Sequence, residues 1–494
     1  MWMTSRDLDF APIRTEFELP PSGDDAFPSD VRAEAVAARD LFAGERTDFS
    51  DLALVTIDPP GSMDLDQAVR IEARSGGWVV YYAIADVGAL VPPGGAMEAE
   101  SLRRGQTIYL PDGSVPLHPR ELSEAAGSLL PGEARAAVLW RVEIDEEARV
   151  LSTDVQRATV RSRERFTYAE VQAAADEGTL AEPIAELPAA GRALRAAGVR
   201  AGAVNLRIPA QDIEGGAGHW ELRIEQRTEA DEWNAQISLL VGRCAAAIML
   251  DGKCGVLRTL PPADEETLTN LRRTAAALQL EWPQEQSLGE FLDSVDVNNS
   301  RGLAMMRAST AALRGADYAA FDGQNPKERD HAGIGGPYAH VTAPLRRLVD
   351  RFATEICLAL TAGTEVPGWV RGAMETLPEV MNSSSRTASS VDRACVDLAE
   401  AVALEEFVGA PLAVYVLRSS TEPKTPEAKE RPGEVFLAQP PVFAPCTGPV
   451  SEGMTATVFV AVADRDTRRV EFSAEEPSEN TADEHAESVP DAAS

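Results

Sequence analysis

The chain has 494 residues, a formal net charge of −33 and 44% hydrophobic residues, which is enough apolar material for roughly two to four domains with buried cores. The acidic balance argues against a nucleic-acid protein that works through a generally positive surface, although a local basic channel stays compatible with it. The N-terminal residues hold no apolar signal segment, and the longest apolar run, near residues 458–462, is too short to span a bilayer. We therefore expect a cytoplasmic protein without membrane contact.

The five cysteines are scattered and form no C-x-x-C pair, which suits a reducing compartment. We expect them to be small buried hydrophobes. They are Cys244, Cys254, Cys357, Cys395 and Cys446.

Residues 1–45 mix proline-rich turns with one predicted helix, "DVRAEAVAARDLF", which Ser29 or Asp30 could cap. A stretch of this length predicts only a small accessory unit, helical or similar to a helix-turn-helix.

Residues 46–405 predict an α+β body. "LALVTID", "AVRIEAR" and "GWVVYYAIADV" are typical of strands, and the first strand ends at an aspartate-rich turn. Helical periodicity follows over 168–200, 234–250 and 265–280, then after "YAHVTAPLRRLVDRFATEICLAL" and again in "SSSRTASSVDRACVDLAEAVALEEFV". The pattern indicates a mixed sheet surrounded by helices.

Residues 406–474 alternate between apolar and polar positions around turn signals, which predicts a small β-barrel of the OB type. The last twenty residues, 475–494, hold seven Asp or Glu and no Lys or Arg, and we expect them to be disordered.

The turn "VTIDPPGSMDLDQAV" places Asp58, Asp64 and Asp66 within nine residues and then continues with Gln67. Like charges held together cost free energy unless a cation balances them. Carboxylate oxygens suit Mg²⁺, or Mn²⁺, and the Pro-Pro-Gly between the first two aspartates could fold all three side chains onto one point. Such a site fits two-metal phosphoryl transfer.

Three other interpretations of this turn compete with the two-metal site, and the sequence argues against two of them. It could be a solvated surface turn, since Asp and Gly are common in turns. A calcium loop would need the pattern D-x-D-x-D-G with a closing Glu, which is absent. A magnesium-dependent phosphatase built on "DLD" would need a parallel Rossmann-type strand and a later lysine motif, which we do not find.

Several motifs together resemble the catalytic domain of the ribonuclease II / ribonuclease R family, which includes the hydrolytic subunit of the exosome. They are, in order, "TIDPPGSMDLDQAV", "YYAIADVGALVPPGG" with its continuation through "LWRVEID", "RATVRSRERFTYAEV" and "GPYAHVTAPLRRLVDRF". The resemblance covers about residues 46–400 and continues into the barrel as an S1-type domain. It implies an RNB-type mixed sheet and a processive, Mg²⁺-dependent 3′→5′ exoribonuclease. Such an enzyme acts as a monomer on the 3′ end of single-stranded RNA and releases nucleoside 5′-monophosphates.

By position in the motif, Asp58, Asp64 and Asp66 match the first three of the family's four catalytic aspartates. Gln67 stands at the fourth, where an amide could ligate a metal through its oxygen or hold a water but supplies no charge; it could also be a simple surface replacement. Arg346 matches the arginine that contacts the scissile phosphate. Arg347, beside it, is expected to contact backbone phosphate or to be structural.

The resemblance also implies RNA contacts. Tyr109 and Tyr168 match tyrosines that position or stack the strand, and Leu206 stands where a second aromatic would be expected. Asp392 and Arg393 replace a Glu-Arg pair of the family, and Ala235-Gln236 stand where acidic residues often occur. The basic residues expected to line the channel are Arg346, Arg347 and Arg351, and the C-terminal barrel is expected to hold RNA on an exposed β-face.

The family's paired N-terminal cold-shock barrels cannot fit into about 45 residues. The open entrance that follows predicts altered access for RNA with a 3′ overhang next to a duplex. An alternative of another class is a catalytically impaired RNA-binding regulator on the same fold, with Gln67 as its mark.

Overall fold

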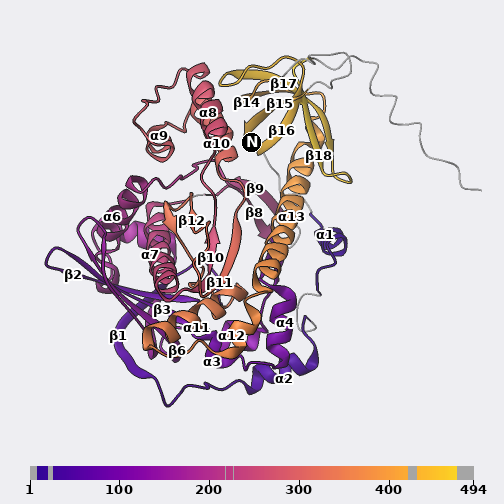
Figure 1. Ribbon diagram of the computed structural model, residues 1–494. Helices are drawn as coiled ribbons and strands as arrows, with labels where there is room; N and C mark the ends of the chain where they lie inside the picture. The colour runs from indigo at the N-terminus through magenta and orange to yellow at the C-terminus, as the bar shows by residue number, and fades with distance from the viewer. Residues whose placement is uncertain (1–7, 21–25, 217–218, 226, 421–430, 476–494) are drawn as a thin grey trace, which may run out of the picture.

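The computed structural model describes residues 8–20, 26–216, 219–225, 227–420 and 431–475. Residues 476–494 of the acidic tail lie outside the described residues. Their disorder therefore stays a prediction. The chain contains two closed barrels, one near its beginning and one near its end, with helices and two-stranded pairs between them (Figure 1).

The larger barrel is formed by five strands. They are β1 (Thr47–Ile57), β2 (Gln67–Arg74), β3 (Gly77–Ala85), β6 (Ala134–Asp145) and β7 (Val150–Phe166). Neighbouring strands pair antiparallel, except that β1 and β7 pair in parallel and close the barrel. The predicted mixed sheet is therefore confirmed, and its closure into a barrel is a feature that the sequence pattern did not indicate.

The barrel strands are rich in β-branched and aromatic residues, which fit a buried pleated surface. Trp140 and Tyr82 are fully buried in the largest core cluster, together with Phe352 from the helical layer. This core sets the barrel rigidly against the helices that surround it.

Four helices of the body pack on or near this barrel: α5 (Tyr168–Glu177), α6 (Leu187–Arg200), α7 (Glu229–Gly252) and α11 (Leu348–Ala362). α5 and α7 begin with capping boxes, Thr167 with Glu170 and Thr228 with Asp231, in which each side chain pairs with the other residue's backbone N–H. The predicted helical regions are confirmed with these bounds.

Among the described residues, α7 is the one helix whose length and composition would allow it to cross a membrane. Ten of its residues are buried, and it packs against α6, α11 and β10. These are the contacts of a core helix.

Shorter elements complete the body. The helices are α3 (Val87–Leu90), α4 (Ala96–Arg104), α8 (Glu265–Ala277), α9 (Leu288–Ser294), α10 (Ser300–Ser309) and α12 (Gly368–Ala373), with single helical turns at Glu121–Ala126, Glu182–Ile184, Thr310–Ala312 and Glu405–Phe407. The strands form two-stranded pairs: β4 (Ile108–Leu110) with β5 (Gly113–Val115), β8 (Gln211–Gly216) with β9 (His219–Ile224), β10 (Cys254–Thr259) with β11 (Asp317–Asp322), and β12 (Asp330–His331) with β13 (Gly336–Pro337).

The C-terminal barrel follows the long helix α13 (Leu377–Leu404). It contains β14 (Pro411–Arg418), β15 (Gly433–Ala438), β16 (Pro441–Thr447), β17 (Thr455–Asp464) and β18 (Arg469–Ser473), in the closed order β14-β15-β16-β18-β17. This confirms the predicted OB-type barrel. α13 runs from the body to this barrel and lies against β17 and β18 (Figure 1).

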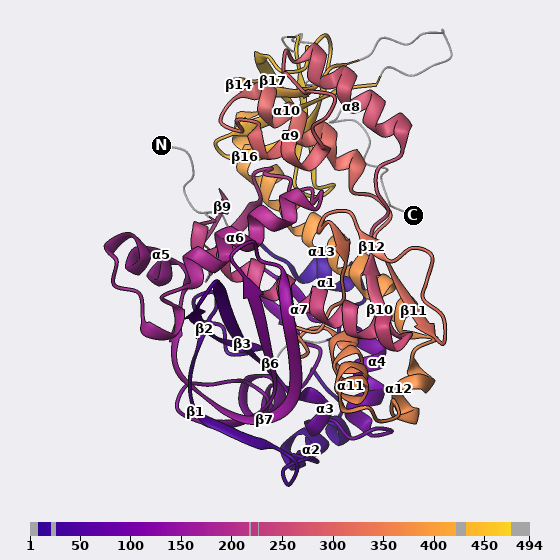
Figure 2. The same cartoon turned by 60° about the vertical axis from the view of Figure 1, so that its left-hand side comes forward.

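The sequence had led us to expect an exposed β-face on the C-terminal barrel. The face that carries its aromatic residues is instead partly covered. Tyr415, Phe436 and Phe443 stack in a row, with ring centroids 6.4 Å and 4.4 Å apart. Phe436 is only 2% exposed because Leu303 of α10 packs on it. α8, α9 and α10 lie beside the barrel (Figure 2), and the middle of the row is covered. Tyr415 and Phe443, at its two ends, are half-buried, and Phe443 lines a cavity.

In residues 8–20 and 26–45 the two helices pack on different parts of the protein. α1 (Ala11–Glu16) joins the core of the C-terminal barrel and α13, where Phe10 meets Trp220 edge to face at 5.3 Å, whereas α2 (Ser29–Ala37) packs on the cluster around α4 and the larger barrel. An N-terminal accessory unit of helix-turn-helix type stays a prediction, since residues 1–7 and 21–25 lie outside the described residues. The capping prediction was wrong, because Pro28 occupies the N-cap of α2 and the helix ends at Ala37.

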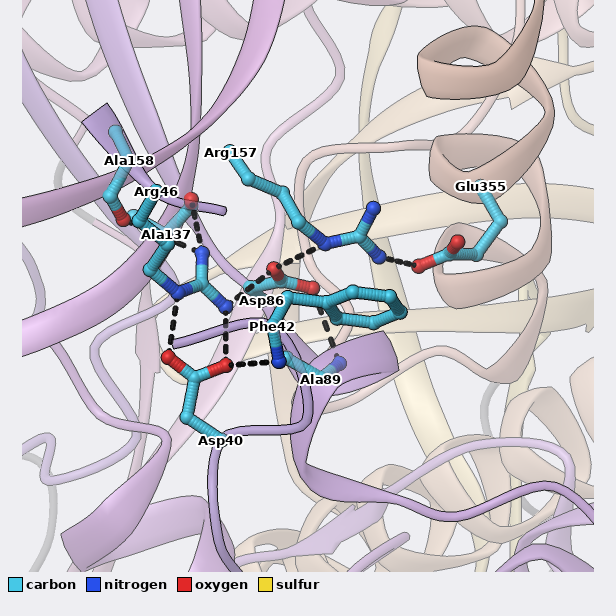
Figure 3. A network of polar contacts seen from close by, with 9 residues as sticks. All are labelled: Asp40, Phe42, Arg46, Asp86, Ala89, Ala137, Arg157, Ala158 and Glu355. Atoms are coloured by element: carbon cyan, nitrogen blue, oxygen red, sulfur yellow. Dashed lines mark hydrogen bonds and ion pairs between the residues drawn. The ribbon is translucent and has the colours of Figure 1, made fainter. Parts of the chain in front are cut away.

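A buried network of charges ties the segment before β1 to the barrel (Figure 3). Arg46 bonds to Asp40 and to Asp86 at 2.6 and 2.7 Å, and Arg157 of β7 reaches Asp86 at 3.1 Å. Arg157 also pairs with Glu355 of α11. The network links β7, α3 and α11 below the barrel and holds the N-terminal segment in place.

Candidate active site

Asp58 lies directly after the first barrel strand. Its backbone N–H donates to the carbonyl of Phe166 at 3.0 Å, which extends the parallel β1–β7 pairing by one residue and fixes the position of the carboxyl group. Asp58 is 8% exposed, and burial raises its pKa to about 6. Its Oδ2 atom is buried and has no hydrogen-bond partner among the described residues.

The loop from Pro59 to Leu65 is held from both sides. Gly61 adopts φ +82°, a left-handed conformation that glycine accepts without strain. Ser128 donates its hydroxyl to the carbonyl of Met63 at 2.6 Å and accepts from the N–H of Leu65 at 3.0 Å. These bonds give the aspartate-rich turn a defined path.

Asp66 is the most enclosed of the three aspartates. Its Oδ1 accepts a 2.8 Å hydrogen bond from the backbone N–H of Leu345, and its Oδ2 lies 3.5 Å from Nε of Arg346. Burial raises the pKa of Asp66 to about 8, against the opposing influence of Arg346. The carboxyl group therefore lacks a full counter-charge.

Gln67 begins β2 and has a structural partner that neither sequence interpretation anticipated. Its amide nitrogen donates a short hydrogen bond to the carbonyl of Thr342. Asp66 and Gln67 thus attach the barrel to the segment 342–346 at two neighbouring points.

Arg347 and Asp350 hold that segment in shape. Arg347 binds Asp350 through two nitrogens at 2.9 and 2.8 Å, and Asp350 accepts from the backbone N–H of Ala343 at 2.7 Å. Arg347 therefore has a structural role, because its pairing with Asp350 fixes the segment 342–346. Arg346 is free of this pairing and its side chain is 46% exposed.

Four of the predicted site residues line one cavity of about 360 Å³: Tyr109, Arg346, Arg347 and Asp392. Tyr109 belongs to β4, is 53% exposed, and directs its hydroxyl toward Asp64 at 3.5 Å. β4 is placed here because the N–H of Thr107 donates to the carbonyl of Arg346 at 3.0 Å.

A second cavity of about 660 Å³ adjoins the first at Ser389 and Asp392 of α13 and extends to the C-terminal barrel. We call the two together the groove. Its charged lining comprises five arginines (Arg307, Arg346, Arg347, Arg393, Arg418) and four acids (Asp392, Asp397, Glu400, Glu434). In a chain of net charge −33 this is a locally basic path, the kind of channel that the overall charge left possible.

Sequence reasoning missed the far end of the groove. Glu434 of the barrel bonds to Arg418 at 3.0 Å and also to Arg307 of α10. Phe443 lines the groove beside them. No sequence motif brought these residues together, because they come from four elements, α10, β14, β15 and β16, that meet only in the folded chain.

The remaining predicted site residues lie in other surroundings. Tyr168 begins α5 and accepts a 3.4 Å hydrogen bond from Asn234 of α7, a partner that the sequence did not single out. Leu206 packs on the cluster of α8, α9 and α10. Arg351 is buried and bonds to Glu98 at 2.8 Å and to the carbonyl of Val91, so the expectation that it lines a channel was wrong.

The donor set fits a hard cation in its chemistry, since Asp58, Asp64 and Asp66 offer carboxylate oxygens from one turn and Asp58 Oδ2 is buried without a partner among the described residues. However, across the described ranges no three His, Cys, Asp or Glu side chains form a group that could hold a metal ion. The expectation that the three aspartates already converge on one point is therefore corrected.

The fold and the site define an α+β protein in which an aspartate-rich turn at a strand end lies beside Tyr109 and Arg346, which line a groove that runs along α13 to an OB-type barrel. Two protein-family models match this chain. One described as the RNB domain matches residues 46–360, and one described as the RNase II-type exonuclease C-terminal S1 domain matches residues 427–475. The chain belongs to the RNB family.

Curated relatives include Ribonuclease R of Escherichia coli, 29% identical over 380 residues, which cover 72% of this chain and 46% of the relative. Another is the Exosome complex exonuclease dis3 of Schizosaccharomyces pombe, 29% identical over 324 residues, covering 62% and 33%. The chain thus spans less than half the length of these relatives.

Two solved structures are similar in fold. Mycoplasma genitalium RNase R in complex with ribose methylated single-stranded RNA has a TM-score of 0.80 at 19% identity, with 94% of this chain and 77% of that chain covered. Yeast Ssd1, described as a pseudonuclease, has a TM-score of 0.65 at 15% identity and covers 84% and 50%.

Proposed function

We propose that this protein is a processive 3′→5′ exoribonuclease that hydrolyses single-stranded RNA to nucleoside 5′-monophosphates. The observation that carries the proposal is the contact of Asp66 with Leu345 and Arg346, because it sets the aspartate-rich turn against a half-exposed arginine that lines the groove. Membership of the RNB family supports the same activity.

The residues would divide the work as follows. Arg346, half-exposed with Asp66 Oδ2 3.5 Å from its Nε, binds the scissile phosphate and offsets the charge that develops on it. Tyr109 and Tyr168 flank the turn and supply aromatic faces for the last nucleotides. Asp392 and Arg393 of α13 lie along the groove that leads the strand in.

We propose Mg²⁺, or Mn²⁺ in its place, as the cofactor, held by Asp58, Asp64 and Asp66. Such an ion would supply activation of water and stabilisation of the leaving oxygen. Its binding requires that the three carboxylates draw together, and the high pKa values of Asp58 and Asp66 give a reason for the affinity, because a cation offsets the cost of burying their charges. Gln67 keeps its amide oxygen for a metal or a water, because within the described residues only its amide nitrogen is engaged, with the carbonyl of Thr342.

The test is to incubate uniformly labelled RNA, and in parallel RNA labelled at its 5′ end, with Mg²⁺ and to follow the products for the natural chain and for Asp66→Asn. We expect Mg²⁺-dependent release of labelled mononucleotides from the uniformly labelled RNA, retention of the 5′ label on the strand until its last product, and no turnover by the variant. Loss of the label from the 5′ end first, or equal products from both proteins, would overturn the proposal.

A second candidate is an RNA-binding regulator with impaired catalysis. The missing fourth carboxylate at Gln67 favours it, and the fold similarity to Ssd1 shows that a pseudonuclease can share this architecture. In the same experiment, binding of RNA without any Mg²⁺-dependent turnover would support the regulator.

Duplex RNA with a 3′ overhang tests the substrate range. Because no residue of 8–20 or 26–45 lines the groove, we propose that the strand can be drawn in up to a duplex edge and beyond. A complete stall at the edge would contradict this. We also propose that the protein works as a cytoplasmic monomer.

A further inference from the structure

A cavity of about 780 Å³ lies away from the groove, among the β6–β7 turn, the end of α6 and the middle of α7. It shares no lining residue with the groove. On α7 its walls come from Leu240, Arg243, Ala247 and Leu250, whose spacing of three and four places them on one helical face. Asn234, which contacts Tyr168, lies about half a turn away from that face by the same spacing.

The walls of this cavity are mainly apolar, and three arginines converge on it. The apolar lining includes Ala148, Val150, Ala197, Leu240, Ala247 and Leu250. The volume of the cavity is within the range of small-molecule sites. The lining holds three arginines, Arg149, Arg200 and Arg243, and one acid, Glu147. Asp145, just outside the lining, pairs with Arg149, which leaves one positive charge in excess. Such a surplus is unexpected in a chain of net charge −33.

The three arginines differ in how far they are engaged. Arg149 pairs with Asp145 at 2.7 Å and with Glu147 at 2.9 Å, and Arg200 donates to the carbonyl of Glu147 at 3.1 Å. Arg243 is half-buried at the wall and has no hydrogen bond or ion pair to any residue in the part of the chain that the structure describes. A guanidinium that is partly withdrawn from water gains most from an anion that binds its fork.

The turn that carries Glu147 supports a formed site. Ala148 adopts φ +61°, in the left-handed region that few residues other than glycine use, and it is 9% exposed. This conformation turns the Glu147 carbonyl toward Arg200, so the turn and the end of α6 are fixed relative to each other.

We propose that this cavity is a second binding site, for a small organic phosphate with a flat apolar body, and that its occupant is a nucleoside 5′-monophosphate. Arg243 and Arg200 bind the phosphate, and the alanine and leucine walls cover the base. The choice of nucleoside 5′-monophosphate among organic phosphates rests on the proposed function, since that reaction produces it. The existence of an anion site rests only on the cavity.

Binding of 5′-AMP, adenosine and inorganic phosphate should be measured by titration calorimetry with the natural chain, with Arg243→Gln and with Arg273→Gln. Arg273 of α8 is a matched control, because it is exposed and contacts only Asn270. We expect Arg243→Gln to weaken 5′-AMP binding at this site about tenfold or more, the cost of one charge-assisted pair, while the control is unchanged. Adenosine and phosphate alone should each bind more weakly than 5′-AMP.

Photo-crosslinking with 8-azido-AMP locates the site. Labelled peptides from residues 147–153, 197–201 or 240–250 support the proposal. Labelling confined to groove peptides, or titrations of Arg243→Gln that superimpose on those of the natural chain, would overturn it. Tight phosphate binding that equals 5′-AMP binding would overturn the choice of ligand. RNA hydrolysis is scored separately, so a failure of the proposed nuclease activity would not imitate any of these outcomes.

Discussion

Leu345 and Asp66 are joined by a buried 2.8 Å hydrogen bond from the backbone N–H of Leu345 to Oδ1 of Asp66, across 279 positions of the sequence. The bond places Arg346 next to the aspartate-rich turn, and the neighbouring bond from Gln67 to the Thr342 carbonyl fixes the same segment a second time. The candidate site therefore depends on the docking of a late segment onto the first barrel.

Replacing Asp66 by Asn should remove activity without unfolding the protein. The amide oxygen can still accept from Leu345, and the variant no longer buries a charge. We expect the turnover rate to fall about 100-fold or more, as for the loss of a group that acts on developing charge, and the melting temperature to stay at or above that of the natural chain. Mg²⁺-dependent hydrolysis within about tenfold of the natural rate would contradict the role given to Asp66.

Replacing Gln67 by Asp should destabilise the protein. The variant loses the donor to the Thr342 carbonyl and places a carboxylate against it, which we expect to cost about 1–3 kcal/mol of unfolding free energy. Urea denaturation measures this, with Gln284→Asp at an exposed position as the control. Equal stability of the two variants would show that the Gln67 contact contributes little. An unchanged Mg²⁺ requirement would show that a fourth carboxylate adds nothing to metal binding.

The buried network around Asp86 should make stability depend on pH. Its drawn members hold three acids, Asp40, Asp86 and Glu355, against two arginines, and burial raises the pKa of Glu355 to about 7 (Figure 3). The unfolded chain releases this proton at lower pH than the folded chain, so the contribution of Glu355 to stability is present at low pH and falls as pH rises toward about 7.

Glu355→Gln mimics the protonated form and should remove that part of the pH dependence. We expect urea denaturation to show similar stability of both proteins near about pH 5, and a relative gain for the variant on the order of 1–2 kcal/mol near about pH 8. Parallel pH profiles for the two proteins would show that Glu355 keeps its charge throughout.

Phe443 should hold RNA at the accessible edge of the C-terminal barrel. Loss of one base-stacking ring costs about 1–3 kcal/mol, so Phe443→Ala should raise the Kd for single-stranded RNA about 5- to 100-fold. The slope of affinity against salt should not change, because no charge is removed. Phe443→Leu is the control for packing on Phe436, and equal affinity of the alanine variant and the natural chain would rule out this contact.

The five cysteines should be unreactive in the folded protein. All of them are buried and free. Ellman's reagent should therefore titrate no thiol before unfolding and all five in guanidinium chloride. Rapid modification of any one under native conditions would show that its region opens.

Local sequence patterns were enough for the elements and for the candidate residues. The aspartates, Arg346 and the strand before Asp58 could be named because a turn at a strand end and an arginine in a motif are short-range features. The periodicity of the helices and the alternation of the second barrel were likewise read correctly, since each depends on residues a few positions apart.

The helices and strands, the family motifs and the residue types of the candidate site could thus be predicted from the sequence. Which of the site residues contact one another depends on the folded chain. Arg351 faces Glu98 in the core, the barrel's aromatic row lies under α10, and Gln67 binds a carbonyl 275 positions away. The physical reason is that burial and hydrogen-bond partners arise from contacts between distant segments, which no periodicity of neighbouring residues encodes.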